Sequence, residues 1–480
     1  MKAPLSKGRK QGGSQEELCF SGRSQGRGPR KKPGLLSGRE DKKLTTAKSD
    51  RDVYYGGAAE VQEIASKLTL HNWYHGMMPR EEIEELLKNE GDFLLRRTDV
   101  NKKPRIAMSV FAGKRIRHIL VMYGDHKWCI RDKRMESLNE LIEFHIKTKT
   151  PVQHDGTIIS TPIPRPDFYI LHDHITIGAR LGGGAFGDVH KGTLRMKDET
   201  SLEVAIKKFK GTMRKKHRGE FVKEARIMRQ FNHKNVVKIY GVAPQEEPML
   251  IVLEFCPGGA LNGHLKKNPD ISVDRLCNYS KDACRGMCYL SQRKIIHRDI
   301  AARNCLLGKE DEVKISDFGL SVATTELKLD KLNKMPVKWL APETLKSGVF
   351  STKSDVWSFG VMMWEIFSRC SADPFPNETN QQAKAKILSG KSPMDAPPNT
   401  PPNMTAIMQL CFTQVVDKRP NFEALFKIMC PKEMPPEPEN NDEFMKEIEK
   451  FKLEAAEQSK NSNVEGTSKN STNRMPTSTS

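Results

Sequence analysis

The sequence of 480 residues is poor in aromatic side chains and has no long uninterrupted apolar run. Aromatic residues make up 7% of it, and no window approaches the roughly 18 apolar residues that indicate a transmembrane helix. The N-terminus lacks the apolar segment of a secretory signal, and Lys2 after Met1 excludes N-myristoylation, which needs glycine there. We therefore expect a protein that does not span a membrane.

The ten cysteines are scattered along the sequence and form no CxxC pair. Small secreted proteins that depend on disulfides have clustered cysteines, and zinc sites have short paired spacings. Neither pattern is present here. The distribution is typical of a protein in a reducing compartment, so we expect a cytoplasmic location.

The net charge of +19 is concentrated in an N-terminal arm rich in Lys, Arg, Gly and Ser. Residues 1–65 have too few apolar side chains to form a core, so we expect a disordered basic arm. Three interpretations of residues 1–51 stay open. They form a solvated tail, they dock on an anionic membrane at the inner face of the plasma membrane, or they bind nucleic acid. The third is disfavoured because no aromatic side chains for base stacking are interleaved, so we expect no specific nucleic-acid partner.

Organised structure is predicted to begin at Trp73-Tyr74-His75-Gly76. An amphipathic helix is expected over residues 79–87, because proline opens it and apolar residues recur on one face. A short strand over residues 93–98 ends in two arginines. Further strands are expected over 106–111, 116–122 and 127–131, and a second helix over 137–147.

The motifs Trp73-Tyr74-His75-Gly76 and Phe93-Leu94-Leu95-Arg96 resemble those of Src-homology-2 (SH2) domains. The resemblance implies recognition of phosphotyrosine by a bidentate arginine deep in a pocket. Arg96 is the expected phosphate ligand. Arg80 from the first helix, Thr98 from the loop after the strand and His118 are expected to complete the pocket. The alternative is that Arg96 is an ordinary arginine at a strand end, with its aliphatic part packed and its charge in solvent.

Two further motifs place carboxylates near each other in the second half of the chain. Residues 296–304 read Ile-His-Arg-Asp-Ile-Ala-Ala-Arg-Asn, and Asp317-Phe318-Gly319 follow. They resemble the catalytic loop and metal-binding turn of protein kinases. The resemblance implies that Asp299 accepts the proton of the attacking hydroxyl, while Asn304 and Asp317 hold Mg²⁺ against the phosphates of ATP.

A glycine-rich segment at residues 181–189 contains the pattern GxGxxGxV. A dinucleotide-binding turn uses a similar pattern but leads into a helix. Here strand-like residues flank it on both sides, which favours a β-hairpin over the phosphates of ATP. The expected ATP-binding residues of this segment are Leu181, Gly182, Gly183, Gly184, Ala185, Phe186, Gly187, Asp188 and Val189.

Lys207, in the strand Val204-Ala205-Ile206-Lys207, is the candidate ligand of the α- and β-phosphates, and Glu224 is its expected partner. Val189 and Ala205 are expected above the adenine and Leu306 below it. The strand 251–255 is expected to supply the hinge.

Ala301 and Arg303 give the catalytic loop the Ala-Ala-Arg form that resembles the tyrosine-kinase branch. Arg303 is the second expected catalytic residue, and Pro336 begins a platform suited to an aromatic substrate ring. We also expect Asp355 to brace the catalytic loop and Glu343 to form a buried ion pair with Arg419.

The span 73–432 resembles the Fes/Fer family of non-receptor tyrosine kinases. Unlike that family, it has no tyrosine between Asp317 and Glu343. Three hypotheses for control of Arg298 follow. An acidic side chain pairs with it, a phosphorylated threonine does so, or a ligand in the phosphotyrosine pocket orders the kinase. The acidic candidates are Glu326 and Asp330, and the threonines are Thr324 and Thr325.

The expected architecture is α+β, with an SH2 domain (a central antiparallel sheet flanked by two helices) followed by a bilobal kinase domain and disordered tails. The expected bounds are 1–65 for the arm, 73–163 for the SH2 domain, 164–173 for a linker, 174–432 for the kinase domain, and 433–480 for a charged helix-like segment and tail. The expected partners are tyrosine-containing protein substrates and phosphotyrosine proteins. The alternative from another class is an adaptor with an inactive kinase fold.

Overall fold

The computed structural model describes residues 64, 67–100, 103–183, 187–209, 215–332 and 335–436. The predicted basic segment 1–51, the predicted charged helix at 442–458 and the C-terminal tail lie outside the described residues. The tip of the glycine-rich segment, residues 184–186, also lies outside them. No helix in the described part of the chain has the length and apolar character needed to cross a membrane.

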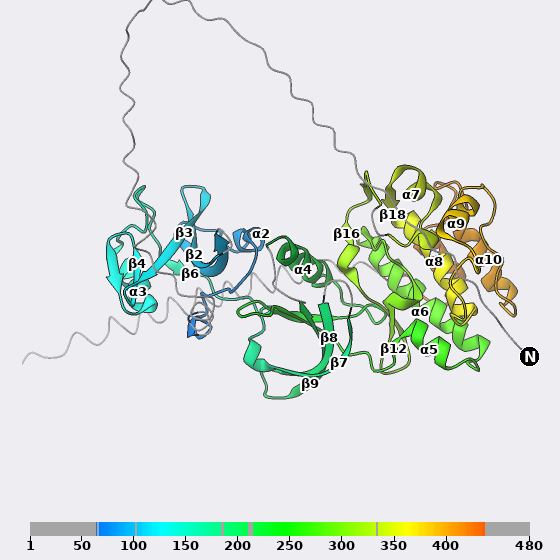
Figure 1. Ribbon diagram of the computed structural model, residues 1–480, viewed down its shortest axis with the longest axis horizontal. Coiled ribbons are helices and arrows are strands. Elements are labelled where there is room, and N and C mark those ends of the chain that lie inside the picture. Colours follow the sequence, from blue (N-terminus) through cyan, green and yellow to red (C-terminus); the bar gives the residue numbers. More distant parts are fainter. Residues whose placement is uncertain are drawn as a thin grey trace, which may run out of the picture. The chain divides into compact units, whose positions relative to one another are not determined.

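A six-stranded sheet in the order β5-β4-β3-β2-β1-β6 forms the centre of the N-terminal domain (Figure 1). Strands β1 to β5 pair antiparallel, and β6 joins β1 in parallel. Its elements are α2 (Arg80–Glu84), β1 (Asp92–Val100), β2 (Lys103–Ala112), β3 (Arg115–Gly124), β4 (Lys127–Ile130), β5 (Lys133–Met135), α3 (Leu138–Thr148) and β6 (Thr161–Pro162). The predicted antiparallel sheet is confirmed.

Helix α2 is shorter than predicted, because it ends at Glu84 and not at residue 87. The carboxylate of Asp92 accepts hydrogen bonds from the amides of Lys88 and Asn89, at 3.0 and 2.8 Å, and so turns the chain toward β1. Helix α3 agrees with its prediction, and the Ser137 hydroxyl caps it by accepting from the amide of Glu140.

A five-stranded antiparallel sheet in the order β10-β11-β9-β8-β7 and helix α4 begin the second domain. These elements are β7 (Ile175–Gly183), β8 (Gly187–Arg195), β9 (Ser201–Phe209), α4 (Lys215–Met228), β10 (Ile239–Ala243) and β11 (Leu250–Glu254). The glycine-rich segment therefore lies in the β7–β8 hairpin, as predicted.

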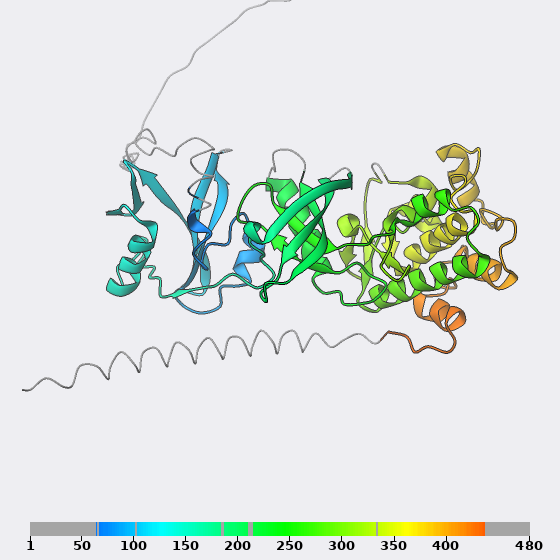
Figure 2. The same ribbon diagram turned by 90° about the horizontal axis from the view of Figure 1, so that it is seen from below.

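The rest of this domain is mainly helical and packs around α6 and α8 (Figure 2). Every residue of α8 from Ser354 to Phe367 is buried, including the carboxylates of Asp355 and Glu365. The helices are α5 (Leu261–Lys267), α6 (Val273–Gln292), α7 (Pro342–Ser347), α8 (Thr352–Phe367), α9 (Asn380–Ile387), α10 (Pro402–Cys411) and α11 (Phe422–Met429). Short strands connect them: β12 (Gly259–Ala260), β13 (Ile295–Ile296), β14 (Cys305–Leu307), β15 (Val313–Ile315), β16 (Val322–Ala323), β17 (Glu326–Lys328) and β18 (Val349–Ser351). Single-turn 3₁₀ helices complete the fold: η2 (His172–His174), η3 (Ala302–Asn304), η4 (Phe318–Leu320) and η5 (Val337–Trp339).

Tyr169, in the segment before β7, is buried and forms a parallel bridge with Val242 of β10. Its ring also meets the His75 ring edge-on, with the centroids 5.7 Å apart. Tyr169 is therefore a packing residue.

Candidate functional site

A buried ion pair joins strand β9 to helix α4. The Nζ of Lys207 lies 2.7 and 2.8 Å from the two carboxylate oxygens of Glu224, and the two side chains are only 12% and 5% exposed. Burial raises the pKa of Glu224, while the nearby ammonium group opposes that rise. The lysine is thus held at a fixed position by a partner seventeen residues away.

Asp317 faces the same lysine from the other part of the domain. Its Oδ1 lies 3.9 Å from the Nζ of Lys207. The residue has a positive φ of 59°, and the next side chain, Phe318, is buried. The Phe318 ring lies 5.0 Å from the rings of both Phe231 and His297, measured between centroids. This packing keeps Phe318 inside and turns the carboxylate of Asp317 outward.

The catalytic loop orients Asp299 through two of its own residues. The Nδ2 of Asn304 donates to the Oδ2 and to the carbonyl oxygen of Asp299, at 2.7 Å each. Arg303 donates to the Oδ1 of Asp299. Both hydrogen bonds of the Asn304 side chain to described residues use Nδ2. Its Oδ1 is therefore available as an oxygen ligand for a metal ion.

Asp355, at the start of α8, holds the backbone of the same loop as predicted. Its two oxygens accept hydrogen bonds from the amides of His297 and Arg298, at 2.7 and 2.9 Å. Burial raises the pKa of Asp355 to about 7, and the two amide hydrogen bonds oppose that rise. Arg298 takes a φ of 73° here, so the loop depends on this support.

The glycine-rich hairpin approaches β9 so closely that Gly187 has no room for a side chain. A Cβ at this position would lie 2.4 Å from the carbonyl oxygen of Lys208. Within the hairpin Gly182 pairs with Val189 and Gly183 with Asp188. The predicted residues Gly184, Ala185 and Phe186 lie outside the described residues, and Leu181 is exposed.

The residues predicted to enclose the adenine lie on adjoining strands. Val189 of β8 pairs with Lys207 of β9, and Ala205 of β9 pairs with Leu253 of β11. Leu306 lies in β14 and pairs with Ala260 of β12, the first strand after β11. The strands therefore place Val189 opposite Lys207 and Ala205 two residues before it.

In the N-terminal domain, Arg96 is part of a chain of hydrogen bonds. The buried Arg96 donates through Nε to the Oγ of Ser109 at 3.3 Å. Ser109 is in turn hydrogen-bonded to the Nδ1 of His118 at 2.9 Å. The Nε2 of His118 lies 3.1 Å from the Oε1 of Glu84, and the same oxygen accepts from the Nε of Arg80 at 2.7 Å.

Thr98 does not lie in a loop, so that prediction was wrong. It belongs to β1, where it pairs with Arg105, because the β1–β2 ladder continues to Val100. The pleat still places it on the same face as Arg96, two residues before it. Sequence reasoning missed Ser109 and Glu84, which reach the pocket from β2 and from the last position of α2.

Comparisons with known proteins agree with this geometry. A family model described as protein tyrosine and serine/threonine kinase matches residues 175–429, and an SH2 domain model matches residues 73–145. Fer-related kinase 1 of Caenorhabditis elegans is 41% identical over 362 residues, which cover 74% of this chain and 92% of that protein. Tyrosine-protein kinase Fer of Mus musculus is 38% identical over 381 residues, which cover 78% of this chain and 45% of that protein.

The chain belongs to the Fer-related tyrosine kinases. Spermatocyte protein spe-8 of Caenorhabditis elegans is a further relative, 37% identical over 318 residues that cover 64% of this chain and 61% of that protein. This Fer-related kinase thus spans nearly all of one relative and less than half of the mouse protein. The predicted fold, an SH2 domain followed by a kinase domain, is confirmed, and ATP is the phosphoryl donor of the kinase family.

In this Fer-related kinase a buried carboxylate links the catalytic loop to the Pro336 platform. The Oε2 of Glu365 accepts from the amide of Ala302 at 2.9 Å and from the indole Nε1 of Trp339 at 3.0 Å. The guanidinium carbon of Arg303 lies 4.6 Å from the centre of the Trp339 ring. Sequence reasoning did not find Glu365, because it lies in α8, more than 60 residues from the loop that it holds.

Among the described residues of the segment that follows Asp317, no acidic side chain pairs with Arg298 of the Fer-related kinase. Its NH1 donates to the carbonyl oxygen of Leu320 at 2.9 Å, and its guanidinium carbon lies 4.7 Å from the centre of the Phe350 ring. Neither Glu326 nor Asp330 contacts it among the described residues, so the hypothesis of an acidic partner finds no support. The hypothesis that phosphorylated Thr324 or Thr325 pairs with Arg298 stays a prediction.

The same segment is held by a strand pair and an apolar cluster. Strand β17 pairs antiparallel with β18, with Leu327 opposite Phe350. The cluster contains Ile296, Val322, Leu327, Leu329, Leu332, Met335, Leu340, Leu345 and Phe350. The predicted ion pair between Glu343 and Arg419 is confirmed at 2.7 Å, with Arg419 fully buried.

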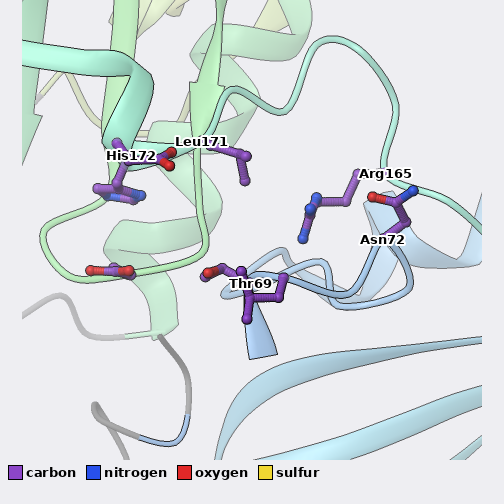
Figure 3. A pocket seen from close by; sticks show the side chains of 8 residues that line it. Thr69, Asn72, Arg165, Leu171 and His172 are labelled. Atoms are coloured by element: carbon purple, nitrogen blue, oxygen red, sulfur yellow. The ribbon is translucent and has the colours of Figure 1, made fainter. Parts of the chain in front are cut away.

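A cavity of about 310 Å³ lies apart from both sites (Figure 3). Arg165 borders it, but its NH1 already donates to the carbonyl oxygens of His71 and Tyr74, at 3.0 Å each. The lining residues are Thr69, Leu70, Asn72, Arg165, Leu171, His172, Asp173 and Glu246. No residue predicted to bind nucleotide or phosphotyrosine is among them.

Proposed function

We propose that this Fer-related kinase transfers the γ-phosphoryl group of ATP to tyrosine side chains of proteins, with Asp299 as the residue that orients and deprotonates the phenol. The observation that carries the proposal is the convergence on Lys207, which lies within 4 Å of Glu224 and of Asp317. Its ammonium group is then placed to bind the α- and β-phosphates.

Arg303 has two contacts that suit a tyrosine substrate. It donates to Asp299 and lies over the Trp339 ring. A positive charge beside the base offsets phosphate charge close to the reacting oxygen. The phenol ring is proposed to rest against the Pro336 platform, whose position is fixed through Glu365.

Mg²⁺ is the proposed metal, because Asn304 and Asp317 offer the oxygen ligands that it prefers. The half-exposed carboxylate of Asp317 and the Oδ1 of Asn304 are the groups that would hold it. When bound, the metal neutralises charge on the ATP phosphates. The positions of these two side chains are fixed by Phe318 and by the contacts of Asn304 with Asp299.

The SH2 domain is proposed to bring the kinase to phosphotyrosine proteins, with Arg96 as the main phosphate ligand. Residues beside the phosphotyrosine are proposed to reach a cavity of about 350 Å³ lined by Ile119, Arg131, Val152, Gln153, His154 and Asp155. Ile119 follows His118 directly in β3, and because successive strand residues point to opposite faces, this cavity lies on the sheet face opposite the phosphate pocket. Arg131 favours an acidic side chain there, because the acidic lining residue Asp155 is already paired with Arg117 at 2.7 Å.

We propose a cytoplasmic location with docking of the basic segment 1–51 on anionic membrane. The support is the charge of that segment, since each Lys or Arg near an anionic surface contributes about 1 kcal/mol. Binding to vesicles with and without phosphatidylserine tests it, and equal binding to both would contradict it.

The decisive test of the catalytic proposal is phosphate transfer from ATP and Mg²⁺ to a poly-Glu-Tyr polymer. Asp299→Asn keeps the size of the side chain and removes the base, and turnover is expected to fall by about 10²- to 10⁴-fold. Equal incorporation by both proteins would refute the role of Asp299. No incorporation by the unmodified chain would favour the adaptor.

A further inference from the structure

The phosphotyrosine pocket of this chain contains an acidic side chain among its cationic groups. Glu84 lies at the last position of α2, four residues after Arg80 and on the same helix face. A single oxygen, Oε1, lies 2.7 Å from the Nε of Arg80 and 3.1 Å from the Nε2 of His118. Two of the four residues predicted to receive the phosphate are therefore in contact with one carboxylate.

The charge of this carboxylate also reaches Arg96. The guanidinium of Arg96 is linked to His118 through Ser109. Burial and the charge of Arg80 lower the pKa of Arg96, and the negative charges of Glu81 and Glu84 oppose that shift. Hydrogen bonding from Arg80 lowers the pKa of Glu84, so this carboxyl is ionised at neutral pH. Burial lowers the pKa of His118 and keeps its ring mainly neutral. The pocket then holds two arginine charges and one opposing carboxylate.

We propose that the Glu84 carboxylate competes with the phosphate of phosphotyrosine for Arg80 and His118. An incoming phosphotyrosine must displace Glu84 from these two side chains. The inference rests on the proposed phosphotyrosine binding and goes beyond it, since it assigns a role in affinity and selectivity to a residue outside the expected pocket. A phosphate dianion has enough charge to replace the carboxylate. A peptide carboxylate offers no gain over the group already present.

Displacement is feasible because the contacts of Glu84 lie near the surface. The side chains of Arg80 and Glu84 are 53% and 38% exposed, so both can rotate into solvent. Ion pairs this exposed to solvent are weak, because water screens the charges and the side chains lose freedom when they pair. The competitor therefore reduces affinity without blocking the pocket.

The test measures binding of a fluorescein-labelled Gly-Gly-pTyr-Gly-Gly peptide to the full chain without ATP. Glu84→Gln and Glu84→Ala both remove the competitor, and each should tighten binding by about 3- to 10-fold, as expected from two weak contacts and one opposing charge. The same variants should gain more affinity for a Gly-Gly-Glu-Gly-Gly peptide, relative to the unmodified chain, than for the phosphopeptide.

Two matched controls separate contact from general charge. Glu81→Gln removes the same charge from the same helix, where Glu81 has no hydrogen bond to Arg80 or His118 among the described residues. Glu143→Gln removes an exposed charge from α3. Glu143→Gln should change the dissociation constant by less than about twofold, and Glu81→Gln should tighten binding less than either Glu84 variant does.

Arg96→Ala separates this inference from the proposed function. If it abolishes phosphopeptide binding while the Glu84 variants bind no tighter than the unmodified chain, the competitor role is refuted and the pocket stands. Weaker binding by the Glu84 variants would mean that the carboxylate positions the ligands, and would also refute the proposal. If the unmodified chain shows no binding that Arg96→Ala removes, both proposals fail together.

Discussion

The apolar cluster behind strand β17 makes a strong prediction about control of the kinase. Leu327 is half-buried and lies opposite Phe350 in the β17–β18 pair. The sequence has no tyrosine between Asp317 and Glu343 whose phosphate could hold this segment in place. We expect the unphosphorylated chain to be active, and Leu327→Ala to lower its activity. The reason is that apolar packing, rather than a phosphate bound to Arg298, holds the segment next to the catalytic loop.

The magnitude follows from burial. A fully buried Leu→Ala change costs about 2–5 kcal/mol, so a half-buried leucine contributes about 1–2 kcal/mol. At about 1.4 kcal/mol per factor of ten, the ordered segment would lose about 5- to 30-fold in population. The value of kcat/KM should fall by up to that factor, while the global melting temperature changes little because the segment lies at the edge of the domain.

The assay uses phosphatase-treated protein, verified by mass spectrometry, with poly-Glu-Tyr, ATP and Mg²⁺. Leu410→Ala, at an exposed leucine of α10, is the matched control and should keep full activity. Hydrogen exchange over residues 321–332 should speed up in Leu327→Ala alone. Loss of all activity on phosphatase treatment, restored by phosphorylation of Thr324 or Thr325, would refute the reasoning.

Three further results are expected. Glu224→Gln removes the charge that holds Lys207 and should lower kcat/KM by about 10- to 100-fold, since a hydrogen bond to a charged group contributes about 1.5–3 kcal/mol; unchanged kinetics would contradict the pairing. Asp355→Asn turns an amide donor toward one of two backbone N–H groups and should cost about 1–3 kcal/mol in the free energy of unfolding, measured with urea. Burial lowers the pKa of His75 to about 4, so the unfolded chain binds a proton that the folded chain does not, and stability falls as the pH drops from 6.5 to 4; His75→Gln should reduce this slope, and an equal slope in both proteins would exclude the effect.

The catalytic positions were predictable because short stretches of sequence carry them. Asp299, Arg303 and Asn304 lie within six residues, so their mutual contacts follow from one loop. The partners that orient such loops come from distant elements. Glu365 lies far along the chain in a helix that is buried all round, and nothing in its local sequence indicates which backbone amide it meets.

Predictions failed where the backbone continued or stopped at a point that tertiary contacts decide. Thr98 remained in β1 because the ladder with β2 extends beyond Arg96. Helix α2 ended early because the chain after it turns, with the amides of Lys88 and Asn89 donating hydrogen bonds to the carboxylate of Asp92. Glu84 then came to lie at the helix end facing His118, a contact between residues 34 positions apart. Periodicity alone does not reveal it.

The buried carboxylate of Glu365 has a consequence for the engineering of substrate specificity. Because one oxygen is shared by Ala302 and Trp339, the surface that receives the substrate ring and the loop that performs the chemistry form a single rigid part. Redesign of the peptide platform alone will therefore disturb turnover as well as substrate choice.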